Sequence, residues 1–84
     1  MNIKIYTTPD CFYCKQLKEL LRRAEIEDYE QEIIQQGKPL SEFKSANPGA
    51  MGFPYVIIDG EPIGGLIETA KLLIKEGLVS SGKR

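Results

Sequence analysis

Both cysteines of this chain lie in one short stretch, DCFYCK at residues 10–15, where Cys11 and Cys14 stand three positions apart. Thiols at this spacing occur in half of a zinc site, in a structural disulfide, as small buried residues, or as a redox-active pair. A zinc ion needs four ligands, and the 84 residues include no histidine and no third cysteine. The metal alternative therefore survives only as an ion or iron–sulfur cluster shared between two chains.

The residues around Cys11 predict the environment of its thiol. From residue 12 to about residue 23, apolar positions recur at helical spacing, which indicates an amphipathic helix. Asp10 or Cys11 then caps this helix, and we favour Asp10 because aspartate is a preferred capping residue; otherwise its carboxylate would disfavour a neighbouring thiolate. The positive end of the helix lowers the pKa of a cysteine placed there below the free value of about 8.5. We expect Cys11 to attack a disulfide and Cys14, one turn further on, to resolve the mixed disulfide.

Alternation, turn signals and helical spacing divide the rest of the chain into further elements. Strands are expected at residues 3–6, 29–34, 54–58 and 61–63, and helices at 40–46 and between Gly64-Gly65 and Gly77. The order β-α-β-α-β-β-α begins with a parallel crossover and ends with a hairpin at Asp59-Gly60. We predict an α/β fold with a four-stranded mixed sheet and helices on both faces, formed by residues 1–79 and followed by a flexible tail at 80–84.

Composition narrows the class of protein. Hydrophobic residues make up 42% of the chain and charged residues 27%, with a net charge of -1, as in ordinary soluble domains. The basic residues form no stripe that could follow a phosphate backbone, so we expect no nucleic-acid partner. No apolar run reaches the ~20 residues that span a bilayer, and no leader pattern opens the chain. We expect a cytoplasmic monomer in a reducing compartment, where such a cysteine pair is catalytic or metal-binding rather than a permanent staple.

Three motifs in a fixed order carry a family resemblance over nearly the whole chain. They are the C-x-x-C site at residues 11–14, the GFPY segment at 52–55, and IGG at 63–65 followed by Glu68. With the strand at 3–6 before them, these motifs resemble glutaredoxins of the dithiol type, in the thioredoxin-like superfamily. The resemblance implies a thioredoxin-like fold and a glutathione-dependent oxidoreductase that reduces protein disulfides and glutathione mixed disulfides. It implies glutathione as the reductant, and no metal.

The resemblance also implies a set of glutathione contacts. Pro54 would be cis, and the backbone of Phe53 would pair with an extended thiol peptide. The backbone amides at Gly64-Gly65 would hold a ligand carboxylate at the start of a helix, and Glu68 would face the α-ammonium group of glutathione. The residues expected to contact glutathione are Tyr13, Phe53, Pro54, Gly65, Leu66, Ile67 and Glu68.

Two positions depart from the family pattern. Thr8 stands where the family commonly has lysine, and Phe12 stands where it commonly has proline. Lys38 or Lys44 could replace the missing cation. These departures support one alternative, a glutaredoxin-like electron donor that thioredoxin reductase recharges and that serves an enzyme such as ribonucleotide reductase. A less favoured alternative is an iron–sulfur cluster carrier that joins two chains through Cys11.

Overall fold

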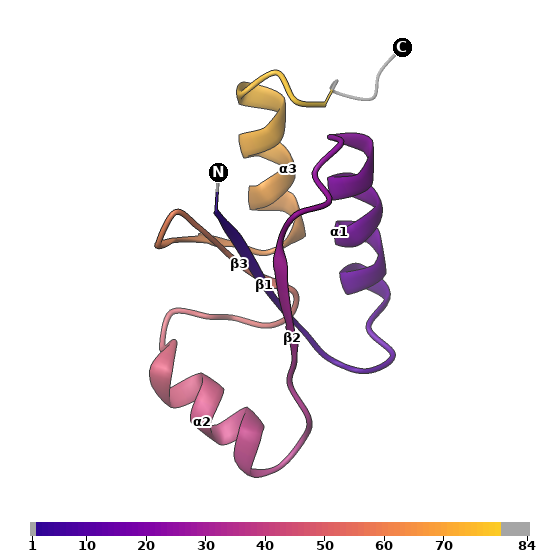
Figure 1. Ribbon diagram of the computed structural model, residues 1–84. Helices are drawn as coiled ribbons and strands as arrows, with labels where there is room; N and C mark the ends of the chain where they lie inside the picture. The colour runs from indigo at the N-terminus through magenta and orange to yellow at the C-terminus, as the bar shows by residue number, and fades with distance from the viewer. Residues whose placement is uncertain (1, 80–84) are drawn as a thin grey trace.

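The computed structural model describes residues 2–79, and seven elements follow one another along them (Figure 1). Their order is β-α-β-α-β-β-α, as predicted from the sequence. The tail expected at 80–84 lies outside the described residues. The elements are β1 (Ile3–Thr7), α1 (Phe12–Arg23), β2 (Glu30–Ile33), α2 (Lys38–Ala46), β3 (Tyr55–Ile58), β4 (Glu61–Gly64) and α3 (Leu66–Lys75).

The four strands form one mixed sheet in the order β2-β1-β3-β4. Strands β1 and β2 are parallel because α1 carries the chain back across the sheet between them. Strands β3 and β4 are antiparallel and joined by a tight hairpin. Asp59 and Gly60 have φ angles of 52° and 81°, the left-handed values that this type of two-residue turn requires. The predicted mixed sheet is confirmed.

Helices cover both faces of the sheet. Side chains alternate between the two faces along each strand, so each face presents side chains against which a helix can pack. Ile3 and Ile5 of β1 are buried against Leu17 and Leu21 of α1 and Leu73 of α3, and Figure 1 shows these two helices side by side. The opposite face packs on α2 through a second, smaller cluster. None of the helices within residues 2–79 has both the length and the apolar content that a membrane span requires. The residues of the second cluster are Ile34, Phe43 and Tyr55, with Tyr6, Leu40, Ala50, Phe53 and Ile57 packed against them.

Strand register brings four chain segments to one edge of the sheet. Ile33 of β2 lies beside Thr7 at the end of β1, and Tyr55 at the start of β3 lies beside Tyr6. Gly64, at the end of β4, lies beside Val56. The loops after β1, β2 and β4 and the segment before β3 therefore meet at the carboxyl end of the parallel pair. Ligand sites of open α/β sheets lie at this end of the strands.

Several element boundaries differ from the sequence prediction. The expected strand 29–34 is shorter, although the Ile34 N–H still donates to the Thr7 carbonyl at 2.7 Å. Helix α2 begins at Lys38 rather than near residue 40, because Pro39 is compatible with the first turn of a helix. Strand β3 begins after Pro54, which has no N–H to donate to a neighbouring strand.

The buried hydroxyl of Thr69 predicts a stabilising substitution. Thr69 lies on α3 with no exposed surface, and its Oγ1 has no hydrogen-bond partner within residues 2–79. Thr69→Val replaces this hydroxyl with a methyl group of similar shape, so it should raise the free energy of unfolding by about 1 kcal/mol. Thermal denaturation should show a midpoint about 4–8 °C higher. Thr69→Ser keeps the hydroxyl and loses the methyl group, so it should be less stable than wild type; a valine variant no more stable than wild type would contradict the assignment.

Candidate active site

Cys11 and Cys14 are joined by a disulfide at the start of α1, with their Cα atoms 5.2 Å apart. Cys11 is the N-cap residue, and its Sγ accepts a hydrogen bond of 3.1 Å from the backbone N–H of Cys14. Only 3% of Cys14 is exposed, whereas Cys11 is partly exposed. A thiol from solvent therefore reaches Cys11 first, and Cys14 is protected beneath it.

Asp10 does not cap α1, and the sequence-based preference for it was wrong. The capping position belongs to Cys11, which has the extended backbone that an N-cap residue requires. Asp10 lies one residue outside the helix in the left-handed region, with a φ of 57°, which aspartate tolerates better than most residues. Its side chain is exposed and forms neither a hydrogen bond nor an ion pair with any residue between 2 and 79.

The Phe53–Pro54 peptide bond is cis, as the family resemblance implied. Pro54 is buried, and the register of β1 with β3 places it at the sheet edge from which the cysteine loop departs. The ring of Phe53 packs against Phe43 of α2, with centroids 5.0 Å apart. This segment is therefore anchored both to the sheet and to α2.

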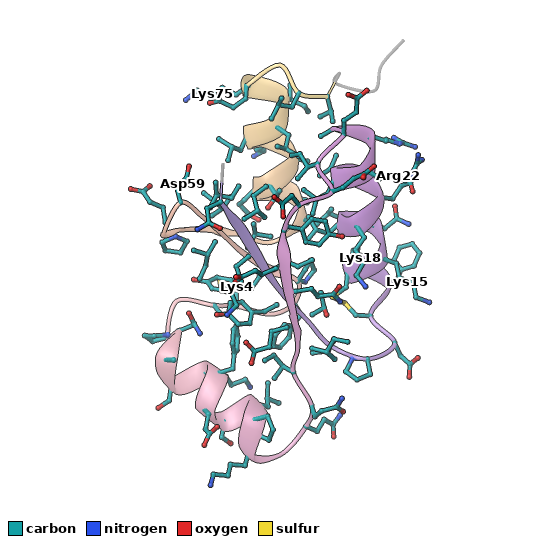
Figure 2. All side chains as sticks on the ribbon, in the orientation of Figure 1. Lys4, Lys15, Lys18, Arg22, Asp59 and Lys75 are labelled. Carbon is teal, nitrogen blue, oxygen red and sulfur yellow. A yellow bond between two sulfur atoms is a disulfide. The ribbon has the colours of Figure 1, made fainter. Side chains whose placement is uncertain are left out.

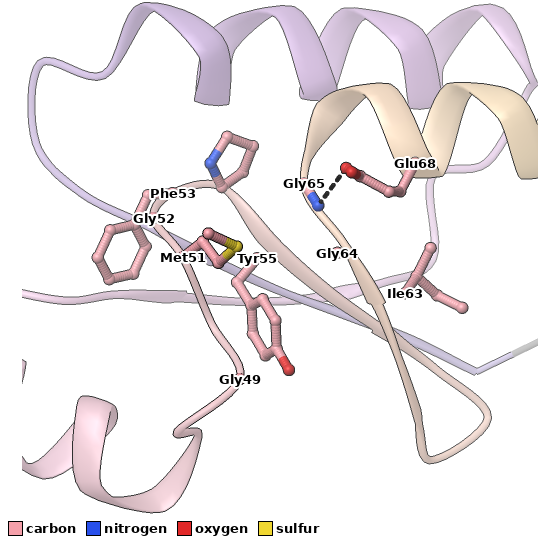
Figure 3. A pocket seen from close by; sticks show the side chains of 10 residues that line it. Gly49, Met51, Gly52, Phe53, Tyr55, Ile63, Gly64, Gly65 and Glu68 are labelled. Atoms are coloured by element: carbon pink, nitrogen blue, oxygen red, sulfur yellow. Dashed lines mark hydrogen bonds between the residues drawn. The ribbon is translucent and has the colours of Figure 1, made fainter.

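A hollow of about 370 Å³, which we call the Pro54 hollow, lies beside the cis bond (Figure 3). A Cβ atom on Gly65 would lie 3.3 Å from the Pro54 carbonyl oxygen, a tight contact, so glycine lets the two backbones approach without a shift of either one. Gly64 has a φ of 127°, which side chains rarely adopt. The lining residues are Gly49, Met51, Gly52, Phe53, Pro54, Tyr55, Ile63, Gly64, Gly65 and Glu68.

Glu68 already occupies part of the anion site at the start of α3. Its Oε1 accepts a hydrogen bond of 3.0 Å from the backbone N–H of Gly65 (Figure 3). Backbone hydrogen bonds from Glu68 itself and then from Gly65 lower the pKa of this carboxyl. The stabilisation that the carboxylate gives to the helix is therefore fully present above the ordinary glutamate value of about 4.3 and is lost as pH falls through the lowered pKa.

A second hollow, of about 580 Å³, lies beside the cysteine loop, and we call it the Thr8 hollow. It shares one lining residue, Phe53, with the Pro54 hollow. The sequence analysis missed the contribution of Gln35 and Gln36, although their position after a parallel strand is where α/β sheets place ligands. The lining residues are Thr8, Pro9, Asp10, Ile34, Gln35, Gln36, Leu40 and Phe53.

With this geometry established, comparison with known proteins gives the family. The family model described as Glutaredoxin matches residues 3–63. The chain belongs to the glutaredoxin family. Its sequence is 36% identical over 75 residues to an uncharacterized glutaredoxin-like 8.6 kDa protein in the rubredoxin operon of Clostridium pasteurianum, an alignment that covers 87% of this chain and 99% of that protein.

Solved structures agree with this assignment. Glutaredoxin 1 from Francisella tularensis, crystallised with cacodylate, matches with a TM-score of 0.73 and 28% identity, over 92% of this chain and 95% of that one. A crystal structure of a thioredoxin-like protein matches with a TM-score of 0.65 and 30% identity, over 84% and 97% of the two chains. The protein is a glutaredoxin-like thiol oxidoreductase with a C-x-x-C pair and a thioredoxin-like fold.

Not every predicted contact of this glutaredoxin lies in the Pro54 hollow. Phe53, Pro54, Gly65 and Glu68 line it. The three other predicted contacts do not: Leu66 and Ile67 line a separate groove between α1 and α3, and Tyr13 is 60% exposed with its ring edge-on to Phe12. Met51, which is 99% exposed, lines the Pro54 hollow and was not predicted.

The cations that could replace the missing family lysine lie elsewhere. Lys44 lines a third hollow, on α2, that also includes Phe53, and Lys38 is exposed at the first position of α2 without lining the Thr8 hollow. Within residues 2–79, no group of three or more His, Cys, Asp or Glu residues could hold a metal ion.

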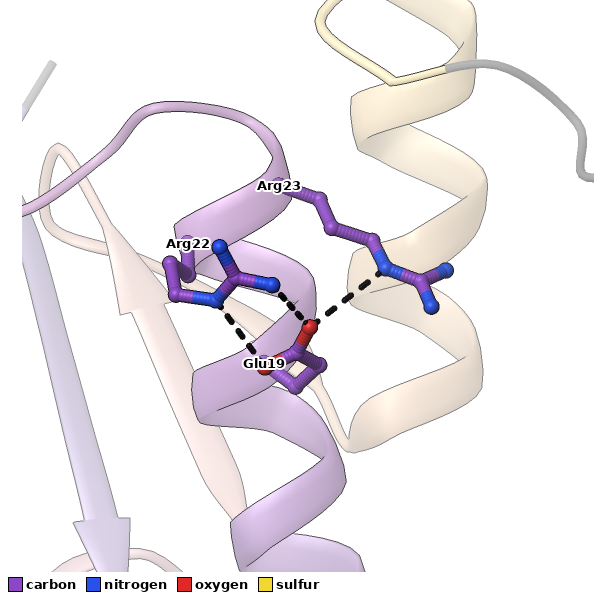
Figure 4. A network of polar contacts seen from close by, with 3 residues as sticks. All are labelled: Glu19, Arg22 and Arg23. Carbon is purple, nitrogen blue, oxygen red and sulfur yellow. Dashed lines mark hydrogen bonds and ion pairs between the residues drawn. The ribbon is translucent and has the colours of Figure 1, made fainter.

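The far end of α1 carries a network of three charges, Glu19, Arg22 and Arg23 (Figure 4). The Arg22 Nε–H donates to Glu19 at 3.0 Å, and this contact and the guanidinium charge lower the pKa of the exposed Glu19 carboxyl. Both arginines lie in the last helical turn, where positive charge complements the helix dipole. The network stabilises the helix that Cys11 caps. It lies at the C-terminal end of this helix, away from the disulfide.

The difference in exposure between the two cysteines predicts their roles. Cys11→Ser should abolish disulfide reduction, because the accessible nucleophile is lost. Cys14→Ser should accumulate a mixed disulfide at Cys11 and retain part of the activity on glutathionylated substrates. Mass spectrometry after limiting alkylation of the reduced protein at neutral pH tests the order directly. Labelling of Cys14 ahead of Cys11 would show that the roles are reversed.

Proposed function

We propose that this glutaredoxin reduces protein disulfides and glutathione mixed disulfides through Cys11 and Cys14, and that glutathione restores the reduced pair. The main support is the Pro54 hollow, where the cis Phe53–Pro54 bond, the close approach of Gly65 and the carboxylate of Glu68 meet at the edge that carries Cys11. We further propose that it works in a reducing compartment such as the cytoplasm, where a dithiol is maintained.

The proposed reduction proceeds in two exchanges. The Cys11 thiolate attacks one sulfur of the substrate disulfide, forms a mixed disulfide and releases the other substrate sulfur as a thiolate, which takes a proton from solvent. Cys14, deprotonated as it attacks, then displaces the remaining substrate thiolate from Cys11. The substrate gains two electrons and two protons, and the protein becomes the Cys11–Cys14 disulfide. The buried position of Cys14 favours this internal step over attack on a second substrate.

Glutathione would reverse these exchanges. One glutathione thiolate attacks Cys11 and displaces Cys14, and a second attacks the sulfur of the bound glutathione, which releases glutathione disulfide and the Cys11 thiolate. In the Pro54 hollow, the ligand backbone would run along Phe53 in the manner of an added strand.

The start of α3 would bind the charged end of glutathione. Because Glu68 Oε1 already accepts from the Gly65 N–H, the ligand carboxylate would use the next amides of the helix, those of Leu66 and Ile67. The second oxygen of Glu68 would accept from the ligand ammonium group. Leu66 and Ile67 thus take part through their backbones while their side chains line a different groove.

The alternative is a glutaredoxin-like electron donor recharged by thioredoxin reductase, with ribonucleotide reductase as one candidate recipient. One observation favours it: within the described part of the chain, residues 2–79, no lysine or arginine lines the Thr8 hollow, so a glutathione carboxylate gains no cationic contact from these residues there. A charge-assisted hydrogen bond of this kind contributes about 1.5–3 kcal/mol, which corresponds to at least tenfold in affinity.

A coupled assay that follows NADPH oxidation distinguishes the two reductants. With a protein disulfide as substrate, we expect turnover with reduced glutathione and glutathione reductase, but with a glutathione requirement raised by about tenfold relative to a glutaredoxin that has the lysine. Thioredoxin reductase alone should support little turnover. The Cys11→Ser variant is the blank for both arms. Turnover only with thioredoxin reductase would reject glutathione as the reductant and select the electron donor.

Glu68→Gln tests the proposed ammonium contact. Glutamine can still accept from the Gly65 N–H but carries no charge, so KM for glutathione should rise by about tenfold. The loss of negative charge at the start of α3 should lower the thermal midpoint only slightly. Glutathione acetylated on its α-amino group carries no ammonium charge and provides the control. The wild-type protein should have a high KM for this analogue, and Glu68→Gln should not raise that KM further. An unchanged KM for glutathione itself in Glu68→Gln would reject the proposed ammonium contact. It would not affect the proposed thiol chemistry.

A further inference from the structure

We propose that Asp10 sets a charge preference for the protein substrate, so that a disulfide flanked by basic residues reacts faster than one flanked by acidic residues. The inference rests on the proposed function in one respect, that Cys11 attacks disulfides of other proteins. It does not depend on which reductant recharges the pair.

The first support is the charge of the Thr8 hollow. Asp10 is the one side chain among the eight lining residues that carries a charge at neutral pH. Its carboxylate is exposed and has neither a hydrogen-bond partner nor an ion-pair partner within residues 2–79. An exposed carboxylate without an internal partner is available to a charge on an incoming chain.

The second support is the place of Asp10 next to the reacting sulfur. Asp10 directly precedes Cys11 and lines the Thr8 hollow, which shares the lining residue Phe53 with the Pro54 hollow. A residue that flanks the substrate cysteine therefore comes close to Asp10 when the chain passes over the Thr8 hollow. The Pro54 hollow adds a second carboxylate, Glu68, and no lysine or arginine among residues 2–79 lines either hollow.

Nearby cations do not cancel this pattern. Lys15 and Lys18 extend from α1, labelled in Figure 2, and line neither hollow. Lys44 lines the third hollow, beyond Phe53. The positive end of α1 acts on the sulfur of Cys11, where it is offset by the negative charge of the attacking thiolate. Among the residues that line the Thr8 hollow, a flanking residue of the substrate therefore meets one charge, the carboxylate of Asp10.

The test uses the reduced protein in a single turnover, without any reductant. Three peptides of sequence Ala-X-Cys-X-Ala, with X as Lys, Gln or Glu, are prepared as disulfide-linked dimers, and formation of the Cys11–Cys14 disulfide is followed by acid quench, alkylation and mass spectrometry. Flanking charge also changes the intrinsic reactivity of the peptide disulfide. The quantity to compare is therefore the Lys-to-Glu rate ratio in wild type against the same ratio in each variant.

Asp10→Asn should lower that ratio by about fivefold at low salt, the size expected for contacts between exposed charges, and added salt should shrink the difference. Asparagine tolerates the left-handed backbone of residue 10, so the loop is retained. Asp28→Asn is the matched control, because Asp28 is an exposed acid just before β2, at the opposite edge of the sheet from Cys11.

The proposal is overturned if the ratio is unchanged in Asp10→Asn, or if it falls equally in Asp28→Asn, which would indicate an effect of net charge alone. A reduced protein that oxidises with none of the three peptides would overturn the proposed disulfide reduction itself and the charge preference with it. The peptides could be reduced with the predicted change in ratio while glutathione fails to support turnover in the coupled assay. That result would support the charge preference and would reject only glutathione as the reductant.

Discussion

Hydrogen bonding of β1 to a strand on each side determines where every part of the site lies. The parallel partner β2 and the antiparallel partner β3 both place their site-forming ends at the carboxyl end of β1. Strand β4 then follows the register of β3, which brings Gly65 within close contact distance of the Pro54 carbonyl. A slip of one residue in any of these pairings would turn each side chain to the other face and separate the segments. The chemistry of Cys11 depends on this register although no strand residue takes part in it.

Two helix starts converge on this edge, and at each of them one backbone amide donates to a side chain of the protein. At α1, the sulfur of Cys11 accepts from the amide of Cys14. At α3, the carboxylate of Glu68 accepts from the amide of Gly65 and has its pKa lowered. The same partial positive charge that stabilises an anion of the protein is the feature that would stabilise a thiolate or a ligand carboxylate. The local electrostatics therefore favour negative charge at the two helix starts. The carboxylates of Asp10 and Glu68 line the hollows beside them.

The backbone gives these hollows much of their shape, and any ligand that they bind would contact it. The cis Phe53–Pro54 bond and the Gly64-Gly65 pair give shape, and the aromatic cluster around Phe43 holds Phe53 in place from the other face of the sheet. Side chains add apolar surface, such as that of Met51 and Ile63, and two carboxylates, Asp10 and Glu68. A backbone-based site accepts many peptide sequences, and a small number of exposed charges then selects among them.

Local patterns in the sequence determined the parts of this glutaredoxin that depend on neighbouring residues. The spacing of apolar residues predicted α1, the Asp59-Gly60 pair predicted the hairpin, and the C-x-x-C stretch at a helix start predicted the redox pair. These features depend on hydrogen bonds and side-chain periods that act within a few residues. The family motif, rather than any local pattern, indicated the cis bond at Pro54.

Tertiary structure alone decided the features that depend on register and on backbone angles. It gave the cap of α1 to Cys11, because a φ of 57° turns Asp10 out of the helix, and it left the Asp10 carboxylate without a partner among residues 2–79. It brought Gln35 and Asp10 to the same hollow, and it placed Leu66 and Ile67 along the groove with α1 instead of the Pro54 hollow. Residues far apart in the chain meet only when strands pair and helices pack, and a sequence pattern that spans a few positions carries no information about such distances.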